Sequence, residues 1–296
     1  MKAPGSLRSS EWFLIVYFGY VALVSLAFPL GPYVAWRPFV VGLLVPALIA
    51  ALSYGELNEY RESFSIARDW LAMALVLIAY REMDWFSATP HDYHLELGWI
   101  KLDRWLLYTA GLQRAIESLG ALLPAYLELC YTLVYAVGPF ALALLYAGHR
   151  RDRSNRLLLT YLLGTLLSYA LFPYFPSDPP RVVFGGSDMP NVVTRLREFN
   201  LWTVNGYGIH SSVFPSAHVS SAFSAAWALL YLLPSKKWIG RSMLVYAISV
   251  SIATVYGRYH YAADVLAGFG ISVFAGWVSL RTLPARRPLP RPPDLP

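Results

Sequence analysis

The sequence predicts an all-α integral membrane protein with about eight transmembrane helices. Of its 296 residues, 56% are hydrophobic and only 14% are charged, whereas a soluble domain usually carries about 25% charged residues. A membrane-spanning helix needs roughly 20 mostly apolar residues. The stretches that meet or approach this length are 12–30, 38–55, 70–86, 122–148, 157–173, 219–234, 242–257 and 261–280.

Cysteine content, charge and the first apolar stretch exclude several other classes of protein. Residues 12–30 are too long for the core of a signal peptide, and no small-residue cleavage site follows them, so we expect this stretch to be retained. The single cysteine, Cys130, lies inside a predicted span and leaves no thiolate pair for a disulfide or a zinc site. The net charge of +6 is typical of arginines that set membrane topology, and we expect no nucleic-acid partner.

Lysine and arginine are concentrated in alternate loops, which predicts the orientation. Cytoplasmic loops are enriched in these residues. The basic groups are Lys2 and Arg8; Arg150, Arg151, Arg153 and Arg156; Lys236, Lys237 and Arg241; and Arg281, Arg286, Arg287 and Arg291. Eight crossings place all four groups, and both termini, in the cytoplasm. The loops 87–121 and 174–215 and the turn around Arg258 then face the extracytoplasmic or lumenal side.

The chain divides into an N-terminal pair of spans over residues 1–66, a six-span core over 67–281 and a Pro/Arg-rich cytoplasmic tail over 282–296. Within the first long loop, Leu95, Trp99, Leu102 and Leu106 recur at helical spacing. This spacing predicts an amphipathic helix at the membrane interface. No internal repeat is visible.

A histidine and an aspartate open the last span. His260 and Asp264 are four residues apart and therefore share one face of a helix. An aspartate among the apolar residues of a span is costly to bury, so Asp264 is a candidate functional group and His260 is its expected partner. A carboxylate on one imidazole nitrogen raises the basicity of the other, which suits a nucleophile or a base. The alternative is a helix-stabilising aspartate beside an interfacial histidine.

A second histidine begins the span at 219–234. Ser216 can cap this helix and His218 then lies in its first turn, where free backbone N–H groups favour an anion. A histidine in this position suits a general acid that protonates a leaving oxygen. An ordinary capped helix with a surface histidine is the alternative.

Two arginines on the same side are candidate phosphate ligands. Arg181 follows the proline-rich segment 175–180, and Arg258 lies two residues before His260. The guanidinium fork matches phosphate oxygens. Two histidines, an aspartate and one or two arginines on one face together fit phosphoryl transfer through a phosphohistidine, without a metal or another cofactor.

The chain resembles the type 2 phosphatidic acid phosphatase (PAP2) superfamily, in particular the branch of the inositol phosphorylceramide synthases. The resemblance covers roughly residues 70–280, which makes 67–281 the catalytic core. The family motif Pro-Ser-Gly-His is matched by residues 215–218 with Ala217 in place of glycine, and the motif that ends in a histidine and an aspartate is matched by His260 and Asp264. The resemblance implies that His260 is the nucleophile, Asp264 orients it, His218 is the general acid and Ser216 binds phosphate.

Two positions depart from the family pattern. Thr254 stands where the family usually has an arginine six residues before the histidine, and Arg258 is a candidate replacement. Tyr174 stands where the first motif usually begins with lysine. The catalytic residues are therefore matched more closely than the phosphate ligands.

The sequence favours a metal-independent membrane phosphatase that hydrolyses a lipid phosphomonoester or pyrophosphate. Two alternatives stay open: a phosphotransferase that moves a phospho-alcohol headgroup between lipids, and a non-enzymatic lipid transporter, which the lack of a repeat disfavours. For Glu128 and Arg81 we expect structural ion pairs, with a place in a headgroup pocket as the alternative.

Overall fold

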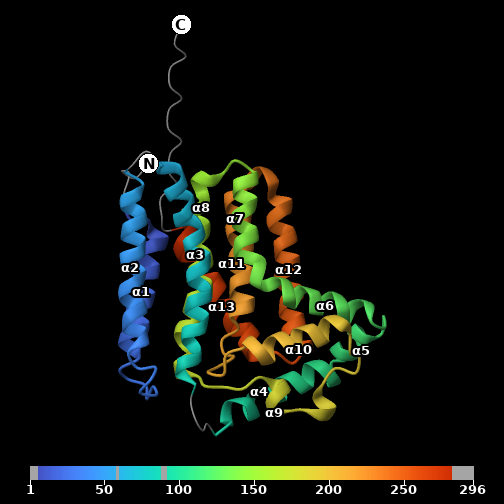
Figure 1. Cartoon of the computed structure of the whole chain (residues 1–296). Helices are drawn as coiled ribbons and strands as arrows, with labels where there is room; N and C mark the ends of the chain where they lie inside the picture. The colour runs from blue at the N-terminus through green and yellow to red at the C-terminus, as the bar shows by residue number, and fades with distance from the viewer. Residues whose placement is uncertain (1–5, 58–59, 88–91, 282–296) are drawn as a thin grey trace.

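The computed structural model describes residues 6–57, 60–87 and 92–281, and these ranges are helical, with no β-strand. The all-α prediction is thus confirmed. The helices of the main bundle stand side by side in Figure 1. They are α1 (Ser9–Val24), α2 (Arg37–Gly55), α3 (Arg61–Met83), α7 (Val137–Ala147), α8 (Ser154–Leu171), α11 (Ala217–Leu232), α12 (Lys237–Tyr256) and α13 (Ala262–Gly276).

Each predicted span corresponds to an apolar helix. Within the described ranges, six helical stretches are long and apolar enough to cross a membrane: Arg37–Gly55, Arg61–Phe86, Leu122–Ala147, Arg151–Tyr174, Pro234–Tyr256 and Ala262–Arg281. The other two predicted spans, at 12–30 and 219–234, correspond to α1 and α11, which are apolar but only 16 residues long. Helix α1 ends at Val24 rather than at residue 30.

A group of shorter helices crosses one end of the bundle and projects to its side (Figure 1). These helices are α4 (His94–Arg104), α5 (Leu112–Glu117), α6 (Leu122–Leu133), α9 (Pro180–Val183) and α10 (Arg195–Tyr207). Helix α6 belongs to the predicted span 122–148, which is therefore bent. The bend is a 3₁₀ turn at Val134–Ala136. Pro139 explains it, because proline has no N–H to offer the carbonyl of Tyr135 one helical turn earlier.

Helices α8 and α11 form the centre of the bundle. Helix α11 packs against α8, α12 and α13, and most residues of α8 and α11 are buried. Small residues allow this close approach: a side chain at Gly164 would collide with Ser224 on α11. Such small contacts are typical of helix packing in membranes, where backbones approach closely.

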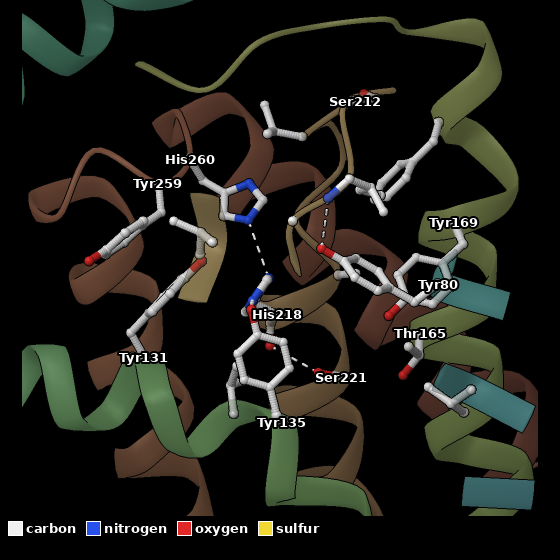
Figure 2. A pocket seen from close by; sticks show the side chains of 18 of the residues that line it. Tyr80, Tyr131, Tyr135, Thr165, Tyr169, Ser212, His218, Ser221, Tyr259 and His260 are labelled. Atoms are coloured by element: carbon white, nitrogen blue, oxygen red, sulfur yellow. Dashed lines mark hydrogen bonds between the residues drawn. The ribbon is translucent and has the colours of Figure 1, made fainter. Parts of the chain in front are cut away.

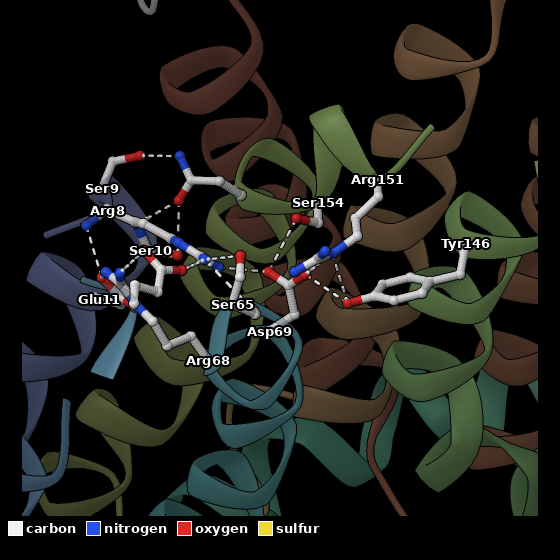
Figure 3. Close-up of polar contacts among 12 residues, drawn as sticks. Arg8, Ser9, Ser10, Glu11, Ser65, Arg68, Asp69, Tyr146, Arg151 and Ser154 are labelled. Carbon is white, nitrogen blue, oxygen red and sulfur yellow. Dashed lines mark hydrogen bonds and ion pairs between the residues drawn. The ribbon is translucent and has the colours of Figure 1, made fainter. Parts of the chain in front are cut away.

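A network of buried charges joins helices at the opposite end of the bundle from α4 (Figures 1 and 3). Arg8 donates to Asp69 and to Glu56 at 2.7 Å each. Arg68 donates to Glu56 at 2.6 Å and also to Glu11. The network ties the start of α1 and the end of α2 to α3, so the N-terminal helix pair is held to the rest of the bundle.

The same network reaches the chain between α7 and α8. Asp69 accepts hydrogen bonds from Tyr146 at 2.6 Å, from Ser154 at 3.0 Å and from Arg151 at 3.2 Å. The start of α1 and the basic loop before α8 therefore lie at one end of the bundle. The domain boundary at residue 66 stays a prediction. The predicted tail 282–296 lies outside the described residues.

Candidate active site

The three sequence segments that carry the predicted site residues meet at one end of the bundle. Backbone hydrogen bonds connect them: Arg181 N–H donates to the Arg258 carbonyl at 3.1 Å, and Ser216 N–H donates to the Asp264 carbonyl at 3.0 Å. Helix α9, the start of α11 and the turn between α12 and α13 thus form one unit. Residues separated by more than 40 positions are brought together by these contacts.

His260 and Asp264 form the predicted pair. His260 Nδ1 lies 3.1 Å from Asp264 Oδ2, and the same oxygen accepts the Tyr261 N–H at 2.9 Å. Asp264 is fully buried and His260 is 5% exposed. A carboxylate oxygen that is held from two sides fixes the orientation of the imidazole ring and favours a hydrogen on Nδ1. His260 Nε2 is then left with its lone pair.

That free nitrogen faces the second histidine (Figure 2). His260 Nε2 lies 3.3 Å from His218 Nδ1. Ser216 begins α11 as its N-cap, with its hydroxyl accepting the Val219 N–H at 3.4 Å, and this cap places His218 in the first turn. The ring of Tyr131 stacks on His218 with centroids 5.0 Å apart and an angle of 10°.

Arg181 supplies a positive charge beside the two histidines. It lines the same cavity as His218 and His260, and its guanidinium lies 5.7 Å from the centre of the Tyr259 ring. Its Nε is buried without a hydrogen-bond partner in the described part of the chain. Burial and then the Arg181 charge lower the pKa of His260 to about 3, although a backbone hydrogen bond with Val213 offsets part of the effect. His260 is therefore neutral at physiological pH.

Arg258 is buried beside the cavity that the two histidines line. It is 1% exposed, its Nη1 donates to Asp103 at 2.7 Å, and it does not line the cavity of the two histidines. Its backbone has a φ of 61°, a conformation that is uncommon outside glycine. The ion pair joins the turn before α13 to α4, whereas Nε and Nη2 of Arg258 are buried without a hydrogen-bond partner in the described part of the chain. Arg181 is the better-placed phosphate ligand.

Helix α4 presents acidic residues to the site. Its buried residues are Glu96, Ile100 and Asp103, whereas Leu102 is 38% exposed. Asp103 accepts the Ala262 N–H at 2.8 Å and thereby binds the first turn of α13. The spacing of these carboxylates, seven residues apart with Ile100 between them, was the sequence signal that could have indicated this face.

Glu128 forms a buried ion pair, as expected for a charge at this depth. Arg197, from α10, donates to Glu128 at 2.8 Å, and both side chains are 3% exposed. Glu128 also accepts from Tyr259 at 2.6 Å and from Asn200 at 2.7 Å. Because Tyr259 stacks on Tyr131 with centroids 3.8 Å apart, this pair supports the aromatic stack under His218. Sequence reasoning missed Arg197, since its partner lies 69 positions away.

Arg81 and two further histidines, His94 and His210, lie outside the central cluster. Arg81 pairs with Asp84 at 3.2 Å and donates to the Tyr207 carbonyl at 3.0 Å. His210 N–H donates to Asp84 at 2.9 Å. His94 pairs with Asp92, and both side chains are exposed. In the ranges that the structure describes, no three His, Cys, Asp or Glu side chains are grouped as a metal site would require.

A cavity of about 110 Å³ extends from the histidines into the bundle. Its walls come from α3, α6, α8, α10 and α11 and from the bend between α6 and α7. Hydroxyl-bearing side chains are frequent in the lining: Tyr80, Tyr131, Tyr135, Tyr161, Thr165, Tyr169, Ser212, Ser221 and Tyr259. The leaving group of a substrate held at the histidines would therefore meet a surface that is partly polar.

Comparison with known proteins identifies the family. A family model described as the PAP2 superfamily matches residues 99–278, a range that includes Arg181, Ser216, His218, Arg258, His260 and Asp264. A PA-phosphatase related-family protein of Dictyostelium discoideum is 25% identical over 139 residues, which are 42% of this chain and 23% of that protein. Lipid A 4′-phosphatase of Bacteroides thetaiotaomicron is 32% identical over 95 residues, which are 29% of this chain and 42% of that protein. The chain thus matches less than half of either relative's length, and no solved structure matches it significantly.

Proposed function

The chain belongs to the PAP2 superfamily, and from that premise we propose that it is a membrane phosphatase that hydrolyses a lipid phosphomonoester or pyrophosphate. The observation that carries the proposal is the approach of His260 Nε2 to His218 Nδ1, at 3.3 Å, beside Arg181, whose buried Nε has no hydrogen-bond partner among the described residues. The lipid A 4′-phosphatase relative supports a lipid phosphate as the substrate. The likeness to inositol phosphorylceramide synthases stays a prediction.

In the first step, His260 Nε2 attacks the phosphorus atom and forms a phosphohistidine. The bond from phosphorus to the leaving oxygen breaks, and that oxygen takes the proton from Nδ1 of protonated His218. The two nitrogens must move apart to admit the phosphoryl group between them, so their present contact is that of the free enzyme. Asp264 keeps the hydrogen of His260 on Nδ1 and stabilises the charge that develops on the ring.

In the second step, water replaces the histidine. The water oxygen attacks phosphorus, one of its protons passes to His218 Nδ1, and the bond from phosphorus to His260 breaks. Inorganic phosphate leaves, and both histidines return to their starting protonation. Because the reaction passes through a loose transition state, positioning and charge stabilisation supply most of the catalysis.

Arg181 and the N-terminus of α11 hold the phosphoryl oxygens in this scheme. Arg181 offers a guanidinium with an unpaired buried nitrogen, and α11 offers the free N–H groups of its first turn. Ser216 contributes by capping this helix, because its hydroxyl and N–H are already bonded to Val219 and Asp264. Arg258 is not part of the scheme, and the reaction requires no metal.

The proposal is tested with purified protein and a panel of lipid phosphates in the presence of a chelator. We expect release of inorganic phosphate, loss of activity by orders of magnitude in His260→Ala, and a ³²P-labelled phosphohistidine trapped by acid-free quenching of the wild type. His218→Ala should lose more activity on poor leaving groups than on good ones. Near-normal activity of His260→Ala would refute the nucleophile assignment. Product analysis with ceramide and phosphatidylinositol separates hydrolysis from headgroup transfer.

We further propose that the site faces the extracytoplasmic or lumenal side and that both termini are cytoplasmic. The basic loop that contains Arg151 lies at the end of the bundle opposite the histidines, which supports this orientation (Figure 1). In a Cys130→Ser background, Val193→Cys, at a 63% exposed position, should react with an impermeant thiol reagent from outside. The exposed Lys236→Cys should react only after the membrane is opened. The reverse pattern would refute the orientation.

A further inference from the structure

Asp103, on α4, contacts the turn between α12 and α13 on both sides of His260. Its Oδ2 accepts from Arg258 Nη1 at 2.7 Å, and its Oδ1 accepts from the Ala262 N–H at 2.8 Å. Arg258 stands two residues before His260, and Ala262 stands two residues after it. Asp103 is fully buried, so water does not compete for its two oxygens. One carboxylate therefore holds both ends of the segment that carries the predicted nucleophile.

The backbone conformation of Arg258 depends on the same contact. Its φ of 61° lies in the left-handed region, which a residue with a side chain adopts only at a cost in free energy. In this conformation the Arg258 carbonyl accepts the Arg181 N–H at 3.1 Å. The ion pair with Asp103 offsets the cost, because it fixes the Arg258 side chain on α4. The position of Arg181, like that of His260, is therefore tied to Asp103.

Asp103 and Arg258 depend on each other to remain charged. Burial raises the pKa of Asp103, and the Ala262 N–H and Arg258 offset part of this effect. Arg258 is 1% exposed, and Asp103 is its acidic partner among the described residues. A buried cation without a counterion is costly. Loss of either side chain therefore removes the same contact from the turn.

We propose that Asp103 is a positioning residue, which fixes the turn so that His260 faces His218. Through the Arg258 carbonyl it also keeps Arg181 beside the two histidines. Asp103 does not line the cavity, and it transfers no proton in the reaction. Its effect on turnover rests on the proposed phosphatase function, whereas its effect on the position of His260 does not.

The two nitrogens of Arg258 that lack a partner, Nε and Nη2, also make this residue a candidate phosphate ligand. The two roles predict different kinetics. Removing a phosphate ligand raises KM, and its effect is independent of Asp103. Removing one half of the pair between Asp103 and Arg258 lowers kcat with little change in KM, and it has no additional effect once the other half is gone.

The first test observes His260 directly, by NMR of the full-length protein labelled with ¹⁵N-histidine. The His260 signals are assigned from their loss in His260→Gln. We expect them to shift or broaden in Asp103→Asn, because an amide has one carbonyl oxygen and can accept on only one side of His260. Asp188→Asn is the matched control, since Asp188 bonds to Arg104, the next residue of α4, and to Tyr108 rather than to the turn. This control should leave the His260 signals unchanged.

The second test measures kcat and KM on a lipid phosphate. Asp103→Asn and Arg258→Met should each lower kcat about tenfold, the effect of losing roughly one charge-assisted hydrogen bond, with KM nearly unchanged. Asp103→Leu removes both bonds and should lower kcat about 100-fold. The double variant Asp103→Asn/Arg258→Met should match either single variant rather than multiply their losses. It contains neither charge of the buried pair, so it keeps the test available if a single variant does not fold. Asp188→Asn should match the wild type.

The outcomes separate the two proposals. Unchanged His260 signals in folded Asp103→Asn, or in the double variant, would overturn the positioning role. So would multiplied losses in the double variant together with a raised KM, which would assign Arg258 to the phosphate instead. If the His260 signals respond but the wild type hydrolyses no lipid phosphate, the positioning contact stands and the phosphatase function fails.

Discussion

Gly268 allows α13 to approach the start of α11, and a single methyl group there should disturb the site. The glycine lies one turn after Asp264, on the buried face of α13. An added Cβ would lie 2.4 Å from the carbonyl oxygen of Ser216, about 1 Å closer than an ordinary contact of 3.4 Å. The obstacle is backbone rather than a flexible side chain, so one of the two helices must move.

The size of the effect follows from this displacement. Overpacking of this kind costs about 1–3 kcal/mol of stability. A misplacement of about 1 Å between reacting groups costs roughly 100-fold in rate. Because Asp264 and Ser216 are also joined by a backbone hydrogen bond, the shift should reach the distance between His260 and His218. We therefore expect Gly268→Ala to remain folded, with a lowered melting temperature, and to lose about 100-fold in kcat.

The same helix provides the control. At Gly270 no atom lies within 4 Å of an added Cβ, and alanine is the better helix former. Gly270→Ala should therefore keep full activity and an equal or higher melting temperature. Phosphate release and thermal unfolding in the same detergent measure both variants. If Gly268→Ala were as active as Gly270→Ala, the close approach of α13 to α11 would not control the site.

Three further predictions concern charges. Arg197→Met leaves Glu128 buried without its cation and should cost about 3–5 kcal/mol of stability. Adding Glu128→Leu should restore most of this loss in the double variant. An Arg197→Met variant as stable as the wild type in thermal unfolding would contradict this. Asp69→Asn should lower the melting temperature through loss of its charge-assisted hydrogen bonds, about 1–3 kcal/mol, while kcat stays normal because the network is at the far end of the bundle. The folded-state pKa of His260 is about 3, below the ordinary 6.5, so between these pH values the folded protein binds fewer protons than the unfolded chain. The protein should therefore lose stability as the pH falls from 6.5 towards 3. Arg181→Gln should raise this pKa and reduce the loss, which is checked by measuring unfolding at several pH values.

The amino-acid sequence by itself determined the class of the protein and the identity of its histidines. Apolar stretches of spanning length predicted the helices, since a membrane requires each segment to satisfy its own backbone. The four-residue spacing of His260 and Asp264 predicted their contact, because helical periodicity is a local property. The bend of the span 122–148 at Val134–Ala136 was not predicted from the sequence.

Only the tertiary structure decided which charged side chains form ion pairs within the protein and which line the cavity. Arg181 and Arg258 were both candidate phosphate ligands in the sequence. In the structure, Asp103 from a distant helix pairs with Arg258, whereas Arg181 lines the cavity of the histidines. The contact of Tyr135 with His218 depends on the bend of one span against the start of another. Contacts of this kind join residues separated by 80 positions or more, and no local periodicity records them. Their energies depend on distance and burial, which exist only once the helices have packed.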